Sequence, residues 1–207
     1  MDQNTMLKVL DTCYEKALTG LPTSKSVNLM ALEYSEKYSS PKKAAKKICD
    51  AQIAKCGTSG FLSGLGGLIT LPVAVPANLA SVIYVQLRMI AAVAKIGGFN
   101  PSDDEVRTMA YACLLGNAGT EVLKKVGINI GEKITINAIK KIPGAVLKKI
   151  NQKVAFRLVT KFGEKGAINL VKLVPLAGGI VGCTIDIATT KAIAKVSIKM
   201  FIDNDIA

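Results

Sequence analysis

The chain contains 32 consecutive residues, from Cys56 to Leu87, without a single charged side chain. Such a stretch can cross a membrane, lie against one, or form the core of a soluble domain. Several glycines and Pro72 interrupt its first half, and the helix expected from Pro76 to about Ile96 carries Arg88 near its centre. A bilayer-spanning helix accommodates such residues poorly, so the sequence favours a soluble core.

The helix expected after Pro76 has a nearly apolar circumference. At 100° per residue, Asn78, Ser81, Arg88 and Lys95 fall on one narrow stripe, and Gln86 is the other polar side chain. We therefore expect the rest of the protein to surround this helix almost completely. The glycine-rich segment 57–75 is predicted to pack beside it as a hairpin-like partner.

The rest of the chain also has the pattern of helices. No segment alternates convincingly with period two, and aromatic residues make up only 5 % of the chain, so its apolar mass is aliphatic. The sequence predicts an all-α fold: a single compact helical domain around the apolar hairpin (core 56–207), with an N-terminal helical arm (1–55). The expected helices are 3–18, 25–38, one starting at Pro41 with Ser40 as its cap, 76–96, 103–116 with Ser102 and Glu105 spaced as a capping box, 143–162 and 178–201.

Several classes of enzyme are disfavoured by what the sequence lacks. It has no histidine, which is the usual general base and the commonest nitrogen ligand of zinc. It also has no GxxxxGK[ST] loop and no GxSxG turn. The sequence predicts no cofactor, no metal ion and no catalytic residue.

The cysteines are scattered, and no two form a CxxC pair. The N-terminus lacks the basic and apolar regions of a secretory signal, so we expect a cytoplasmic protein. A peripheral position at the inner face of the cell membrane is compatible with this expectation. The thiols are then expected to pack as small apolar groups. Cys49 and Cys56, seven residues apart, leave a redox or metal role as an alternative.

One buried ion pair is predicted from two helical patterns. In the last helix Lys191, Lys195 and Lys199 form one stripe, whereas Asp186 lies on the opposite side and points inward. Arg88 is the natural partner for a buried carboxylate, and removing either group should cost about 3 to 5 kcal/mol. A proton-relay or ligand-binding carboxylate is the alternative reading of Asp186.

Basic residues are concentrated in one fifth of the chain. Residues 124–165 contain eleven Lys or Arg against two Glu, which is +9 of the total net charge of +12. Charge on this scale selects anionic partners. The residues predicted to bind a polyanion or lipid are Lys140, Lys141, Lys148, Lys149, Lys153 and Arg157.

The helix expected at 143–162 is amphipathic. Its apolar side is formed by Val146, Leu147, Ile150, Val154, Leu158 and Phe162. A helix on the surface of any soluble protein has a similar pattern, so an ordinary solvated face remains an alternative to a binding surface.

Anionic lipid is the partner that this charge favours. The basic segment has no Trp or Tyr to stack on bases, and no helix-turn-helix or zinc pattern stands out, so nucleic acid ranks second. A protein partner remains open, and an enzyme ranks third. We therefore expect a non-catalytic protein that docks on the membrane surface through its basic helices.

The order of several segments resembles a known family. These segments are LITLPVAVPANLASVIYVQLRMIAAVAKIGGF, YACLLGN, IKKIPGAVLKKINQKVAFRLVTKFGEKGAINL and VPLAGGIVGCTIDIATTKAI, which together cover about 57–201. They resemble the EcsC family of bacterial proteins. The resemblance implies a helical bacterial protein of the cytoplasm and is compatible with membrane association, but it supplies no catalytic residues.

Overall fold

The computed structural model describes residues 2–22, 24–56, 77–129, 135–162 and 178–203, and leaves the side chains of 56, 77–78 and 178–186 outside the description. In these ranges every regular element is a helix, which confirms the all-α prediction. The elements are α1 (Gln3–Thr19), α2 (Val27–Lys37), α3 (Pro41–Cys56), α5 (Ala77–Ile96), α6 (Asp104–Cys113), α7 (Asn117–Lys124), α8 (Ile136–Lys140), α9 (Gly144–Phe162) and α11 (Gly178–Phe201).

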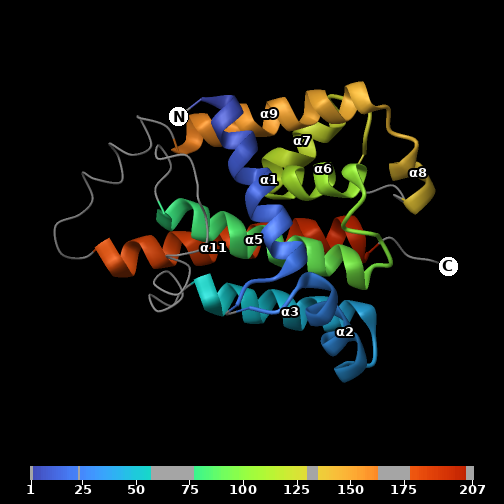
Figure 1. The fold of residues 1–207 in the computed structure, drawn as a ribbon, viewed down its shortest axis with the longest axis vertical. Coiled ribbons are helices and arrows are strands. Elements are labelled where there is room, and N and C mark those ends of the chain that lie inside the picture. The colour runs from blue at the N-terminus through green and yellow to red at the C-terminus, as the bar shows by residue number, and fades with distance from the viewer. Residues whose placement is uncertain (1, 23, 57–76, 130–134, 163–177, 204–207) are drawn as a thin grey trace.

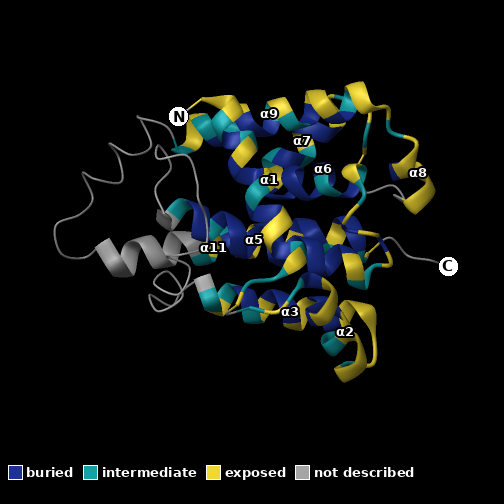
Figure 2. Cartoon of the chain, viewed as in Figure 1, coloured by how far each residue is buried: buried dark blue, intermediate teal, exposed yellow. Residues whose placement is uncertain are grey.

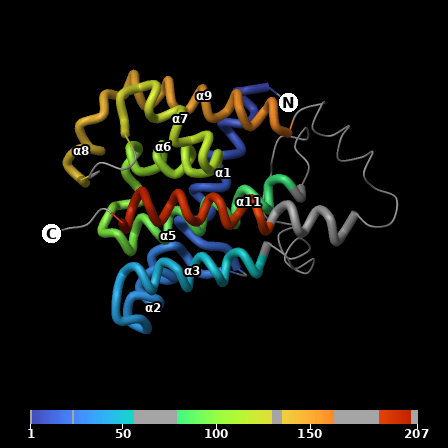
Figure 3. The backbone as a smooth tube through the Cα atoms, turned by 180° about the vertical axis from the view of Figure 1, so that it is seen from behind, coloured from blue at the N-terminus to red at the C-terminus, as the bar shows by residue number. Residues whose placement is uncertain are grey.

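Helix α5 lies at the centre of the fold. It contacts α1, α2, α3, α6 and α11, with α1 crossing it on one side (Figure 1) and α11 running along the other (Figure 3). Helices α2 and α3 lie on one flank of this central pair, and α6, α7 and α9 lie on the opposite flank (Figure 1). The expectation that protein surrounds this helix is confirmed.

The burial of α5 is nearly continuous along its length. Its residues from Ile83 to Ala94 are all buried, whereas Lys95 at its end is exposed (Figure 2). Within the described residues, α5 is the one helix long and apolar enough to span a membrane, over Leu79–Ile96, and 83 % of that window is buried inside the protein. The core helix of a soluble protein has these same properties, so length and composition alone do not place α5 in a bilayer.

The N-terminal helices share the core with α5. Val9, Leu10 and Tyr14 of α1 are fully buried in the same hydrophobic cluster as the residues of α5, and the Tyr14 hydroxyl donates a hydrogen bond to the carbonyl oxygen of Pro101 at 2.8 Å. The proposed division into an arm (1–55) and a core (56–207) stays a prediction. The predicted hairpin segment 57–75 lies outside the described residues.

The caps of two helices show how local sequence sets their boundaries. The Ser40 hydroxyl accepts a hydrogen bond from the backbone N–H of Lys43 at 3.2 Å, as predicted for the start of α3. Helix α6 begins differently, because its N-cap is Asp103 rather than Ser102. The predicted capping box does not form, since no side chain caps α6; instead, Asn100 donates to the Asp103 carboxylate and accepts from the Ser102 N–H in the turn before the helix.

Candidate functional site

Helix α9 presents one side to the core and one to solvent. Leu147, Ile150, Val154 and Leu158 are buried against α1, α6 and α7, which confirms the predicted apolar side of this helix. Figure 2 shows exposed residues along the outer edge of α9 and over α8. The remaining circumference of α9 therefore carries its basic residues.

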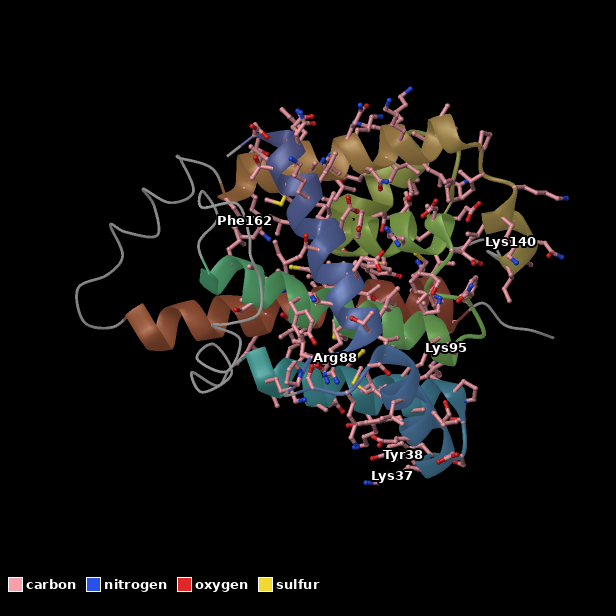
Figure 4. All side chains as sticks on the ribbon, in the orientation of Figure 1. Lys37, Tyr38, Arg88, Lys95, Lys140 and Phe162 are labelled. Carbon is pink, nitrogen blue, oxygen red and sulfur yellow. The ribbon has the colours of Figure 1, made fainter. Side chains whose placement is uncertain are left out.

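The six predicted binding residues lie on α8, directly after it, or on α9. Lys140, Lys141, Lys148 and Lys149 are exposed, and Lys153 and Arg157 are partly buried. They do not form a single cluster. Lys140 lies on α8, whereas Arg157 lies near the far end of α9, which Phe162 marks in Figure 4.

Three of the six line one groove between α9, α7 and the start of α1. This groove has a volume of about 420 Å³. Its lining residues are Gln3 from α1, Val122 from α7, Lys125 directly after α7, and Lys149, Gln152, Lys153, Phe156 and Arg157 from α9. We call this set the basic groove.

The helical repeat explains which lysines reach the basic groove. Residues 149, 152, 153, 156 and 157 recur at intervals of three and four, so they form one stripe along α9. Lys148 precedes Lys149 directly in the sequence but projects about 100° away around the helix axis. Lys140, Lys141 and Lys148 do not line the basic groove.

The basic groove has an excess of positive charge. Glu121 lies beside one of its cations, with Oε2 at 3.5 Å from Nη2 of Arg157. Within the described residues, no acidic oxygen lies within 4 Å of the ammonium groups of Lys125, Lys149 or Lys153. Because like charges repel when brought together, an anion that enters the groove lowers the electrostatic energy of the site.

Five of the groove residues are absent from the predicted set. Lys125 belongs to the basic segment noted in the sequence, but its position beside α9 depends on how α7 packs. Gln3, Val122 and Gln152 carry no charge, and nothing in the sequence indicated them. Phe156 is 53 % exposed, and an exposed aromatic residue on an amphipathic helix is the feature that could have indicated its role.

Arg88 is buried, as predicted, with 3 % of its surface exposed. Its Nε and Nη2 atoms donate to the carbonyl oxygen of Lys25 at 3.2 and 2.8 Å, and its Nη1 donates to Oε1 of Gln52 at 3.2 Å. Burial lowers the pKa of the guanidinium below its ordinary value, although an arginine still remains charged. Arg88 thus connects α5 to α3 and to the segment before α2 (Figure 4).

The side chain of Asp186, the predicted partner of Arg88, lies outside the described residues. The Arg88–Asp186 ion pair therefore stays a prediction.

The cysteines with described side chains lack the exposed, electropositive surroundings of a reactive thiol. Cys13, Cys49 and Cys113 are free and buried, and burial raises the pKa of each thiol to about 12. A thiol with such a pKa is protonated at neutral pH and makes a poor nucleophile. Among the residues with described positions, no group of three or more Cys, Asp or Glu side chains could hold a metal ion.

Comparison with known proteins identifies the family. The model of the EcsC protein family matches residues 3–202, which is nearly the whole chain. This protein therefore belongs to the EcsC protein family, and the match extends over α1, α2 and α3 as well as over the segments quoted above. Neither the search of curated proteins nor the search of solved structures found a match.

Proposed function

We propose that this protein docks on the surface of an anionic membrane through its basic helices and carries out no catalysis there. The proposed binding residues lie on α8, directly after it, and on α9: Lys140, Lys141, Lys148, Lys149, Lys153 and Arg157. The observation that carries the proposal is the basic groove, where three of these residues meet Lys125 and where, in the described part of the chain, Glu121 forms an ion pair with Arg157. Cations held together in this way attract anionic surfaces.

Exposed apolar side chains on the same helices favour a membrane over other polyanions. Phe156 of α9 is 53 % exposed and Ile136 of α8 is 40 % exposed. A helix that lies in the membrane interface combines a basic face with large apolar side chains that reach the boundary between headgroups and acyl chains.

The first test measures flotation with vesicles of phosphatidylcholine containing phosphatidylglycerol. Wild-type protein is expected to float with them at low salt and to dissociate as salt increases, because screening shortens to about 8 Å at physiological ionic strength. A variant with all six residues changed to Gln should fold normally and lose flotation, since each lysine near a charged leaflet contributes about 1 kcal/mol. Vesicles of pure phosphatidylcholine are the control.

The proposal is wrong if wild-type protein stays in solution at low salt, or if the six-residue variant floats as well as wild type. In the first case, a shift of labelled duplex DNA or RNA by the wild-type protein would assign the basic helices to nucleic acid instead.

A second test addresses the apolar contribution. Phe156→Gln is expected to weaken vesicle binding about tenfold, because burying a phenylalanine side chain contributes about 1.5 to 3 kcal/mol when complete. Leu32→Gln on α2 is the matched control, since Leu32 is 54 % exposed but lies on the opposite flank of the fold (Figure 1). Equal binding by Phe156→Gln and wild type, or a larger loss for Leu32→Gln, would show that α9 does not face the membrane.

A further inference from the structure

The basic groove differs from the rest of the basic surface in its shape. Lys140 of α8, Lys141 directly after it and Lys148 of α9 are exposed and do not line this groove, so we expect each to contribute only a diffuse attraction. By contrast, Lys125, Lys149, Lys153 and Arg157 line one depression of about 420 Å³. This depression is more open than enclosed, so it offers a place for one headgroup at the surface and not a cavity that buries a whole ligand.

The polar groups of the basic groove suit a phosphate ester. Three ammonium groups and one guanidinium provide the charge-assisted hydrogen bonds that phosphate oxygens accept. The amides of Gln3 and Gln152 add neutral donors that could bind hydroxyl groups or ester oxygens beside the phosphate. Glu121 is paired with Arg157, so it holds the guanidinium in position and leaves the three lysines for the ligand.

The apolar wall of the basic groove indicates where such an ester comes from. Val122 and Phe156 line the same depression as the lysines, and the ring of Phe156 remains about half exposed. A lipid headgroup presents a phosphate next to apolar chains, whereas a free phosphate ester has no apolar part to cover this ring. We propose that the basic groove is a specific site for the phosphate of an anionic lipid headgroup. This inference rests on the proposed membrane docking. It adds that the groove residues contribute more to lipid binding than the other basic residues do.

The test compares two variants with the same loss of charge. The groove variant changes Lys125, Lys149 and Lys153 to Gln. The surface variant changes Lys124, Lys141 and Lys148 to Gln, which are exposed lysines on the same flank that do not line the basic groove. Circular dichroism of both variants checks that the helices are intact.

In flotation with phosphatidylglycerol vesicles, the groove variant is expected to bind at least about tenfold more weakly than the surface variant, because both lose the diffuse attraction of about 1 kcal/mol per lysine and the groove variant also loses direct contacts with the phosphate. Equal losses would overturn the groove as a specific site while leaving membrane docking in place.

A second experiment, with a soluble phosphate ester, distinguishes a lipid headgroup from a free phosphate ester as the ligand. Wild-type protein is titrated with glycerol phosphate, and NMR follows the chemical shifts. If the groove binds lipid, glycerol phosphate should bind far more weakly than vesicles do, and the shift changes should be concentrated at the groove residues. Glycerol phosphate binding without any flotation would overturn both the lipid source and the proposed function. Shifts distributed over all exposed lysines, with none concentrated in the basic groove, would overturn the site itself.

Discussion

Replacing Gly119 by alanine is expected to destabilise the protein by about 3 kcal/mol, because the new methyl group would meet the backbone of another helix. A Cβ at this position would lie 1.9 Å from the carbonyl oxygen of Ala112 and 2.8 Å from its carbonyl carbon. Both atoms belong to the backbone of α6, so no side chain can rotate to make room. The absence of a side chain at Gly119 is therefore what allows α7 to pack so closely against α6.

Gly144→Ala provides the matched control for this prediction. Gly144 is the first residue of α9, and a Cβ there would meet nothing within 4 Å. This substitution should be neutral or stabilising by up to about 1 kcal/mol, because alanine loses less backbone entropy in a helix than glycine does. Urea denaturation followed by circular dichroism measures both. A free energy of unfolding for Gly119→Ala within about 0.5 kcal/mol of wild type would contradict the close packing of α6 and α7.

Gly119 also bears on the basic groove. Helix α7 supplies Val122 and is followed directly by Lys125, and both line the groove. If Gly119→Ala moves α7 away from α6, then Lys125 moves relative to α9. Vesicle binding by this variant should therefore decrease even under conditions where it remains folded.

Arg88→Met is expected to lower the free energy of unfolding by about 3 kcal/mol. Methionine preserves much of the apolar stem but leaves the carbonyl oxygen of Lys25 and Oε1 of Gln52 without the donors that they have now. A buried acceptor that loses its donor costs about 1 to 3 kcal/mol. Lys95→Met is the control on the same helix, since Lys95 is exposed (Figure 4) and its loss should change stability by less than about 0.5 kcal/mol.

A double-mutant cycle with Asp186→Asn tests the ion pair predicted from the sequence. If Arg88 and Asp186 are in contact, the two substitutions should be non-additive by about 1 kcal/mol or more. Additive effects would remove the ion pair and leave the hydrogen bonds of Arg88. Wild-type stability of Arg88→Met itself would contradict the role of Arg88 as a link between α5, α3 and the segment before α2.

The parts of the fold that could be predicted are those set by periodicity within one helix. The apolar side of α9, with Leu147, Ile150 and Val154, follows from the 3.6-residue repeat alone. The same reasoning predicts that protein surrounds α5, because this helix is apolar around most of its circumference. Arg88 lies on the narrow polar stripe of that helix, and its burial is predicted from the need of Asp186 for a partner.

The basic groove could not be predicted in this way, because it depends on contacts between segments far apart in the sequence. Gln3 and Lys125 reach α9 only because α1 and α7 pack against it. Counting charges along the chain grouped Lys148 with Lys149, although the helix directs these neighbours to different sides. The sequence thus predicted a basic region, and the packing of three helices selects the part of it that forms a groove.

The most direct test of membrane docking is a competition between the two polyanions at low salt. Wild-type protein is mixed with phosphatidylglycerol vesicles and with duplex DNA at equal total negative charge, and the vesicles are then separated by flotation. If docking uses both the lysines and the exposed Phe156, most of the protein should float with the vesicles. DNA has no acyl region that could bury the ring of Phe156. Protein that remains with the DNA would contradict membrane docking and assign the basic helices to nucleic acid.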